Sequence, residues 1–289
     1  MARKRLWDWL AGGLALGGLA IITLGYTNAT AVPVVRRLNL IVPGYPPPDP
    51  PASIVLFSDA HVHAPDMPPS RLGQIVGQIN ALHPDIVLGT GDFTGNNWIG
   101  RDYPAEEAVA PLKRLKARFG VYAVLGNNDY RAGADEVARA LEGAGVHLLR
   151  NDAAAAGPIA LGGIDGRIHH RLAGWTAARE SAYDALSRTP GFQVLAAHRP
   201  DEFVPVPQSV RLVLAGHTHC GQIVLPFWGA LESGSDYGMR YLCGVHREGS
   251  KLLVVTAGLG TSYLPLRFGA PPDIWLITIQ GPARGPARI

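Results

Sequence analysis

The sequence predicts an α/β fold that is extended by further sheet in its second half. Between Ser53 and about residue 200, short apolar segments alternate with amphipathic segments, which is typical of parallel strands joined by helices. In the last third, three apolar segments follow one another with only glycine- and proline-containing loops between them. This second pattern favours antiparallel strands, so we expect a parallel sheet first and an antiparallel addition after it.

The strands and helices of this pattern can be placed in order along the chain. Apolar runs bounded by turn residues predict strands at 53–57, 85–90, 120–126, 159–165, 192–198, 210–217, 251–258 and 273–279. Apolar residues at helical spacing predict a helix that Ser70 caps and Pro84 ends. Further helical stretches are predicted at 111–119, at 177–188 and at 134–145, the last closed by glycine.

The length and composition of the chain are typical of one main domain with appendages. A chain of 289 residues with 47% apolar content can bury one substantial core. The net charge of +3 is small and the basic residues are scattered, so no nucleic-acid partner is expected. Two cysteines, Cys220 and Cys243, are too few for a disulfide framework, and whether they pair is left open.

The N-terminal segment has the features of a membrane anchor. Three cations in "MARKR" precede an apolar run from Trp9 to Tyr26, which approaches the roughly 20 residues needed to cross a bilayer. We expect a single-pass anchor in the cytoplasmic (inner) membrane, with the rest of the chain facing the periplasm or exterior. A cleaved signal peptide is the alternative, because Ala29 and Ala31 form an Ala-x-Ala site.

These features divide the chain into four parts. Residues 1–31 form the anchor or signal peptide, and residues 32–52 form a connector that contains the proline-rich "PGYPPPDPP". Residues 53–280 form the main domain. Residues 281–289 form a tail that is too short and polar to fold alone.

Polar side chains with metal-binding chemistry follow five of the predicted strands. In open α/β folds, ligands bind beyond the carboxyl ends of the strands. Any one of these side chains has an ordinary structural explanation, but burying all of them without a shared partner would be costly, and a shared cation removes the cost. The residues are Asp59 and His61 in "LFSDAH", Asp92 in "VLGTGD", Asn127, Asn128 and Asp129 in "VLGNND", His198 in "LAAH", and His217 and His219 in "LAGHTH".

The spacing of these side chains suits two neighbouring cations. His217 and His219 are two positions apart, so they point to opposite sides of an extended backbone and can bind one ion each. Asp59 and His61 would bind the first ion, and a carboxylate such as Asp92 can bridge both. Two ions about 3.5 to 4 Å apart form the arrangement that hydrolyses phosphate esters.

The ordered motifs "SDAH", "GTGD", "GNND", "AAH" and "GHTH" resemble the five blocks of the calcineurin-like metallophosphoesterases, and the likeness runs from Ser53 to Ile279. The later "GHTHCGQIVLP" and the hydrophobic N-terminus resemble the membrane-associated bacterial phosphodiesterase branch of that family. That branch includes general phosphodiesterases and hydrolases of lipid-linked or nucleotide-sugar pyrophosphates. The resemblance implies an αββα sandwich of two mixed sheets, with a two-metal site along one edge.

The resemblance also implies roles for individual residues. A hydroxide held by both ions would attack phosphorus, and manganese, iron or zinc suits such imidazole-rich sites. We interpret His63 as a phosphate contact, and His169 and His170 as ordinary loop residues. The implied ligands are Asp59, His61 and His219 for the first ion, Asp92 as the bridge, and Asn127, His198 and His217 for the second ion.

Asn128 departs from the family pattern, in which this position is a histidine that contacts phosphate and protonates the leaving group while the next residue, here Asp129, orients it. An amide can donate a hydrogen bond to phosphate but cannot deliver a proton near neutral pH. General acid catalysis is typically worth 10²- to 10⁴-fold, and its loss matters most for alkoxide leaving groups. We therefore hypothesise a preference for pyrophosphates or activated diesters.

Three functional hypotheses follow from the sequence. The first is a metal-dependent phosphoesterase of the phosphodiesterase or pyrophosphatase type, acting on a phosphoester or pyrophosphate that could be lipid-linked. The second is a catalytically weak binding or scaffold module on the same fold. The third is a one-metal hydrolase of a non-phosphate substrate. The apolar segment "VLPFWGAL" (224–231) could be part of the core or a membrane-facing lip.

Overall fold

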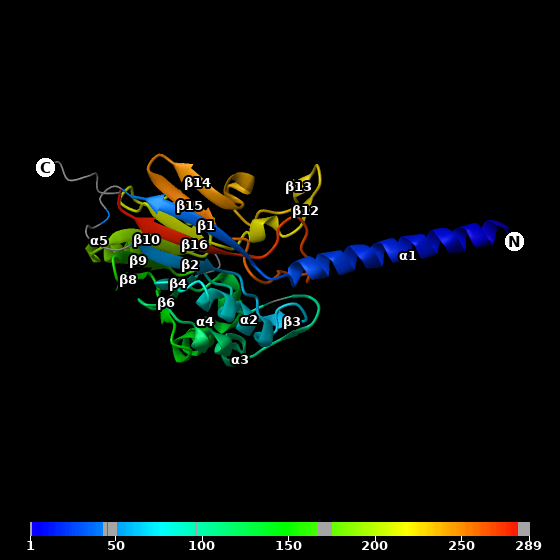
Figure 1. Cartoon of the computed structure of the whole chain (residues 1–289), viewed down its shortest axis with the longest axis horizontal. Helices are drawn as coiled ribbons and strands as arrows, with labels where there is room; N and C mark the ends of the chain where they lie inside the picture. Colours follow the sequence, from blue (N-terminus) through cyan, green and yellow to red (C-terminus); the bar gives the residue numbers. More distant parts are fainter. Residues whose placement is uncertain (1, 43–44, 46–50, 96, 167–174, 283–289) are drawn as a thin grey trace.

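The computed structural model describes residues 2–42, 45, 51–95, 97–166 and 175–282. Over this part of the chain, two sheets lie face to face, helices cover their outer faces, and one long helix projects away from the body (Figure 1). The family expectation of an αββα sandwich with an N-terminal apolar helix is confirmed.

The first sheet gathers strands from both ends of the chain. Helices α2 (Pro69–Asn80), α3 (Ala105–Val109) and α4 (Asn127–Gly143) cover its outer face, and a 3₁₀ turn, η1 (Ala110–Arg114), follows α3. Within the described residues, the strand order is β1 (Val34–Ile41), β16 (Asp273–Gln280), β2 (Ala52–Phe57), β4 (Ile86–Gly89), β6 (Val121–Ala123) and β7 (His147–Leu148).

The second sheet is built from the middle and the later part of the chain. Helix α5 (Trp175–Arg188) and the 3₁₀ turn η2 (Pro200–Phe203) lie on its outer face. In the described ranges, its order is β14 (Gly244–Glu248), β15 (Lys251–Val255), β11 (Leu212–Ala215), β10 (Phe192–Ala197), β9 (Ile159–Ile164) and β8 (Asp152–Ala156).

Small elements complete the edge of the sandwich from which α1 projects. They are the strand pair β3 (His63–Ala64) and β5 (Arg101–Asp102), the pair β12 (Val224–Leu225) and β13 (Gly229–Ala230), and the 3₁₀ turns η3 (His219–Gly221) and η4 (Gly238–Tyr241).

Strand β2 shows why the sheets pack as layers. Its side chains alternate between two apolar environments: Val55 and Phe57 join the core under the helices, whereas Ile54 and Leu56 join the core between the two sheets. All four are almost fully buried. Burying such a side chain stabilises the fold by about 1.5 to 3 kcal/mol, so a strand apolar on both faces belongs in the middle of a layered structure.

The expectation of antiparallel pairing in the last third is wrong for most of the second sheet. Strand β11 pairs parallel with both β10 and β15, and antiparallel pairing occurs at β14–β15 and at β16–β2. The chain between β11 and β15 makes its crossover through short hairpins and 3₁₀ turns instead of a long helix. The sequence pattern of this crossover therefore resembles that of a hairpin connection.

The predicted connector at 32–52 is wrong in its first part, which forms strand β1. Val34 to Ile41 pair in parallel with Asp273 to Gln280, so the main domain begins before residue 53. The proline-rich stretch lies mostly at 43–44 and 46–50, outside the described residues, as do 283–289 of the predicted tail.

Several predicted helix bounds differ from the observed ones. Helix α2 has Pro68 at its N-cap and ends at Asn80, so Ser70 lies inside the helix and does not cap it, and Pro84 lies beyond its end. Helix α4 begins at Asn127 instead of residue 134, so the "GNND" motif opens the helix, and Gly133 interrupts it with a φ of 116°. Residues 105–114 form α3 and η1, whereas the predicted helical stretch continued to 119.

Helix α1 (Ala2–Ala29) carries the predicted anchor. Its segment Trp7–Ala29 is long and apolar enough to cross a bilayer. The leucines at 14 and 16 are more than two-thirds exposed, so the middle of the helix has no apolar partner in the described part of the domain.

Candidate two-metal site

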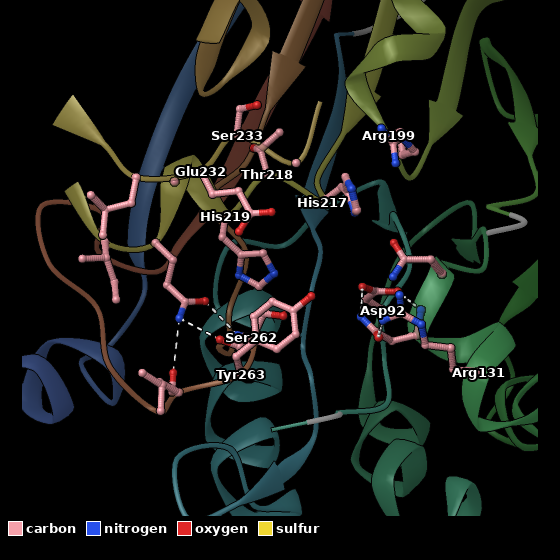
Figure 2. A pocket seen from close by; sticks show the side chains of 18 of the residues that line it. Asp92, Arg131, Arg199, His217, Thr218, His219, Glu232, Ser233, Ser262 and Tyr263 are labelled. Atoms are coloured by element: carbon pink, nitrogen blue, oxygen red, sulfur yellow. Dashed lines mark hydrogen bonds between the residues drawn. The ribbon is translucent and has the colours of Figure 1, made fainter. Parts of the chain in front are cut away.

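The candidate site lies where the carboxyl ends of strands from both sheets meet. Asp59 and His61 follow β2, Asp92 follows β4, and Asn127 follows β6. The second sheet contributes His198 after β10 and two histidines, His217 and His219, after β11. Figure 2 shows His219 on one side of the resulting cleft, with Asp92 on the other side and His217 toward the top.

Glycines permit this close approach of the loops. A Cβ atom added at Gly126 would lie 2.2 Å from Oδ1 of Asp92, and one added at Gly216 would lie 2.3 Å from Oδ2 of Asp59. Only glycine fits at either position, which explains the glycine in "GNND" and in "GHTH".

Five of the seven predicted ligands adopt positive φ angles, between 41° and 70°. L-residues other than glycine rarely adopt this backbone geometry, and it costs on the order of 1 to 3 kcal/mol each. Such strain is retained where the surrounding structure forces it, and it gathers at functional sites. The five residues are Asp59, His61, Asp92, His217 and His219.

The first cluster consists of Asp59, His61 and His219, all three buried. The Nε2 atoms of the two histidines are 3.1 Å apart, and they lie 3.8 and 3.6 Å from Oδ1 of Asp59. Among the described residues, this Oδ1 atom has no hydrogen-bond partner. A buried carboxylate oxygen without a partner, facing two imidazole nitrogens, fits the donor set of a divalent transition metal.

The second cluster consists of Asp92, His198 and His217. Nε2 of His198 lies 3.4 Å from Oδ2 of Asp92, 3.0 Å from Nδ1 of His217 and 3.1 Å from Oδ1 of Asn127. Nδ1 of His198 lies 2.7 Å from the carbonyl oxygen of Thr90, so it can donate its proton there and keep Nε2 free as a ligand. All seven side chains predicted as ligands therefore come together in two adjacent groups.

The electrostatics of the clusters suit cation binding. Burial, followed by the neighbouring His198, lowers the pKa of His217, and burial with His61 lowers that of His219, so both rings are neutral as ligands must be. Burial alone would raise the pKa of Asp92, but His198 and the other imidazoles hold it well below its usual range. Burial raises the pKa of Asp59, a carboxylate that a bound cation would stabilise.

Asn128 lies against Asp92 at the start of helix α4. Its backbone N–H donates to Oδ1 of Asp92 over 2.7 Å, and its side-chain Nδ2 donates to Oδ2 over 2.6 Å. Its Oδ1 accepts from Nη1 of Arg131 at 2.9 Å. Both ends of the amide are therefore occupied, and Asn128 connects the predicted bridging carboxylate to an arginine that the sequence did not single out.

Asp129 has a different position from the one expected. Its carboxylate accepts backbone hydrogen bonds of 2.8 to 3.1 Å from Gly126, Asp92, Phe93 and Thr94, and another from the Thr94 hydroxyl. The expectation that Asp129 orients the side chain at 128 is not supported by these contacts. Asp129 instead joins the loop after β4 to the start of α4.

Two arginines near the site were not predicted from the sequence. Arg267 is fully buried; it donates to the carbonyl oxygens of Ala257, Gly260 and Ala270, and its Nη2 lies 3.3 Å from Nδ1 of His219. Burial lowers the pKa of Arg267 to about 10, which leaves it charged at neutral pH. Neither Arg267 nor Arg131 lies in one of the five metal-binding motifs, so neither was predicted as a site residue.

His63 does not lie where a phosphate contact would be. It is buried, its Nε2 lies 3.4 Å from Oδ1 of Asp102, and it does not line the cleft in the described structure. The predicted loop histidines His169 and His170 lie outside the described residues.

An open cleft of about 750 Å³ lies over the two clusters. Its polar base includes Asp92, His217 and His219, and Figure 2 shows Arg131 and Arg199 at the same side as Asp92. The opposite wall is partly apolar. The apolar and aromatic lining residues are Trp98, Ile223, Leu231, Tyr263 and Leu264.

Cys220 and Cys243 form a disulfide next to the first cluster. Cys220 directly follows His219, and the neighbouring Thr218 hydroxyl donates to the carbonyl oxygen of Leu242 over 2.7 Å. The covalent bond and the hydrogen bond together hold the loop of His219 against the segment before β14. The pairing left open by the sequence is therefore present.

Comparison with known proteins agrees with this geometry. The family model for calcineurin-like phosphoesterases matches residues 52–221. The chain is 34% identical over 233 residues to the metallophosphoesterase YkuE of Bacillus subtilis (strain 168), covering 78% of each chain. It is 31% identical over 233 residues to a metallophosphoesterase of Aquifex aeolicus (strain VF5), covering 79% of this chain and 85% of that one.

A third relative is a "transmembrane protein with metallophosphoesterase domain" of Danio rerio, 30% identical over 283 residues, which cover 92% of this chain and 62% of the relative. The chain belongs to the calcineurin-like phosphoesterase family. With its two candidate metal clusters, it is a metal-dependent phosphoester hydrolase.

Replacing Asp129 by asparagine should destabilise both the fold and the site. The amide cannot accept all the N–H groups that now converge on the carboxylate, so Asp129→Asn should lower the free energy of unfolding by about 2 kcal/mol or more. Denaturant unfolding measures this loss. Asp135→Asn, an exposed site on the same helix, is the matched control and should change stability by about 0.5 kcal/mol at most. Equal stability of the two variants would contradict the role given to Asp129.

Proposed function

We propose that this chain hydrolyses phosphodiester or pyrophosphate bonds with two divalent ions, of manganese, iron or zinc, bound by the two clusters. The observation that carries the proposal is the position of Asp92. Its Oδ2 atom lies 3.5 Å from Nε2 of His61 in the first cluster and 3.4 Å from Nε2 of His198 in the second. The carboxylate of Asp92, a member of the second cluster, therefore also faces the first cluster, as a bridging ligand would.

The bound ions and the protein side chains have different roles in the proposed hydrolysis. When bound, such an ion pair activates water and neutralises charge that develops on phosphorus. Asp59, His61 and His219 would hold one ion, Asn127, His198 and His217 the other, and Asp92 both. Arg131 and Arg199 add positive charge to the cleft, which favours an anionic substrate.

Metal removal and titration test this function. Chelation should abolish hydrolysis of bis(p-nitrophenyl) phosphate, and added manganese should restore it with two ions per chain, counted by elemental analysis. His219→Ala should reduce both the metal content and the rate, because it removes a ligand of the first ion. Two bound ions without hydrolysis of any diester or pyrophosphate would favour the scaffold alternative. A single ion at saturation, with no phosphoesterase activity, would favour the one-metal alternative.

The contacts of Asn128 support a preference for good leaving groups. Its amide is engaged by Asp92 and Arg131, and an amide cannot protonate a departing alkoxide. A guanidinium is not a general acid in proteins, so Arg131 supplies positive charge but does not replace the missing proton donor. Pyrophosphates and aryl diesters, whose leaving groups depart without a proton, fit this site better than alkyl diesters.

Introducing a proton donor should therefore change the leaving-group preference. Asn128→His should raise the rate on alkyl phosphodiesters relative to p-nitrophenyl diesters, by up to about 10²-fold, because general acid catalysis becomes possible. Asn128→Gln, which keeps the amide, is the control and should gain nothing. Kcat/KM for the two substrate types measures the ratio. If the wild-type chain already cleaves alkyl diesters as fast as matched pyrophosphates, the preference does not exist.

The N-terminal helix and the disulfide support a location of the catalytic domain at the outer side of the cytoplasmic membrane. We propose a single-pass anchor in the cytoplasmic membrane with the catalytic domain on the outer side. The segment Trp7–Ala29 is long enough to span a bilayer, and one relative is described as a transmembrane protein. Disulfides persist in oxidising compartments, so the Cys220–Cys243 pair fits the outer side. The substrate on that side could be lipid-linked, and no nucleic-acid partner is expected.

The disulfide offers a test of the orientation. Peptide mapping without reduction, on protein taken from membranes after blocking free thiols, should yield one fragment joined through Cys220 and Cys243. Blocked thiols at both positions would place the domain in a reducing compartment.

A further inference from the structure

The base of helix α1 is attached to the loop that forms one wall of the cleft. The carbonyl oxygen of Gly25 accepts from the backbone N–H of Arg267 over 3.0 Å, and Nδ2 of Asn28 donates to the Arg267 carbonyl oxygen over 3.3 Å. The ring of Phe268 packs so closely on Gly25 that an added Cβ would lie 2.6 Å from it. The anchor helix and the loop at 261–269 are therefore one packed unit.

A second attachment comes from helix α2. Nη2 of Arg71 donates to the carbonyl oxygens of Ala29 and Ala31 over 3.0 and 2.9 Å, and the Tyr26 hydroxyl lies 3.2 Å from the carbonyl oxygen of Pro65. With the end of α1 held on two sides, the domain surface around it lies close to any bilayer that α1 spans.

Several large apolar side chains surround this attachment and are exposed. We call them the apolar rim. Phe227 and Trp228, at the turn between β12 and β13, are fully and 82% exposed, and Trp98 is 74% exposed. A single exposed apolar residue is ordinary, but several of them, aromatic ones included, on the same end of the domain indicate an interaction site. The rim consists of Trp98, Ile99, Phe227, Trp228, Leu231 and Tyr263.

Hydrogen bonds connect the rim to the base of α1. The N–H of Val224 donates to the carbonyl oxygen of Phe268 over 2.8 Å, which places the β12–β13 hairpin beside the loop that holds the helix. The N–H of Trp98 donates to the carbonyl oxygen of Tyr263 over 2.9 Å, and their rings are 5.3 Å apart. Figure 1 shows β12 and β13 at the end of the domain from which α1 projects.

The hairpin turn has a composition that water-facing turns avoid. Residues 223–231 carry no charged side chain. Phe227 has a φ of 70°, where glycine or asparagine is favoured. An exposed phenylalanine in this backbone geometry adds nothing to the packing of the domain. In membrane proteins, tryptophan and tyrosine are enriched at the level of the lipid headgroups.

We propose that the apolar rim inserts into the interfacial layer of the bilayer that α1 spans. This inference rests on the proposed membrane anchor. Trp98, Leu231 and Tyr263 belong to the rim and also line the cleft, so insertion directs the mouth of the catalytic cleft toward the lipid surface.

Site-specific fluorescence quenching in the full-length chain tests the insertion. Both native cysteines are in the disulfide, so a single introduced cysteine can be labelled selectively. Pro226→Cys reports on the exposed hairpin turn and keeps its aromatic residues. Ile41→Cys is the matched control, since Ile41 is 64% exposed at the far end of β1, and Leu16→Cys reports on insertion of α1 itself.

Each variant is labelled with an environment-sensitive fluorophore and reconstituted in phosphatidylcholine and phosphatidylglycerol vesicles. Lipids with a nitroxide near the headgroup should quench the label at position 226 severalfold more than the label at 41. Adding Phe227→Ser and Trp228→Ser to the Pro226→Cys chain should remove the difference, because the turn loses its inserted side chains.

The remaining outcomes overturn the proposal in distinguishable ways. Quenching at position 16 by deep nitroxides, with equal quenching at 226 and 41, refutes the rim and leaves the anchor standing. No quenching at 16 refutes both the anchor and the rim, while the hydrolytic function is measured separately. If the label at position 226 is protected from quenching, and this protection disappears when the chains are diluted in lipid, a second copy of the chain covers the hairpin turn instead of the bilayer.

Discussion

Two buried carboxylates and four buried or nearly buried imidazoles share one small volume at the edge of the sandwich, and burying so many metal-binding groups together is the constraint that the surrounding structure has to meet. Asp59 has an oxygen with no hydrogen-bond partner among the described residues, and the pKa of that side chain is raised by burial. A divalent cation at the first cluster would give this oxygen a partner. Cations at both clusters would explain why the strained backbone of the loops is retained. The glycines, the positive φ angles and the Asp129 contacts are all means of holding these groups together.

The candidate site could be predicted because its chemistry is local in sequence and its assembly follows a general rule. Polar residues that directly follow apolar strands stand out in a single sequence, and the carboxyl ends of parallel strands meet at one edge of a sheet. For this reason Asp59, Asp92 and His217 could be assigned to a common site without knowing the strand order. The two-residue spacing of His217 and His219 indicated two ions, and the resemblance to a known family then supplied the full set of ligands for each.

The sequence could not reveal features that depend on which distant segments become neighbours. Strand β1 pairs with β16 across almost the whole chain, and nothing near residue 34 indicates such a partner. The parallel neighbours of β11 were obscured because its crossover lacks a long helix. Arg267 reaches His219 only through tertiary packing, and Asp129 was misjudged because its five donors lie on two separate loops.

Because the last residues of α1 are hydrogen-bonded to both Arg71 and the loop of Arg267, the proposed membrane anchor would tilt together with the domain. A transmembrane helix adapts to a thinner or thicker hydrocarbon layer mainly by changing its tilt. Here that adjustment would rotate the whole domain and alter the height at which its cleft meets the lipid.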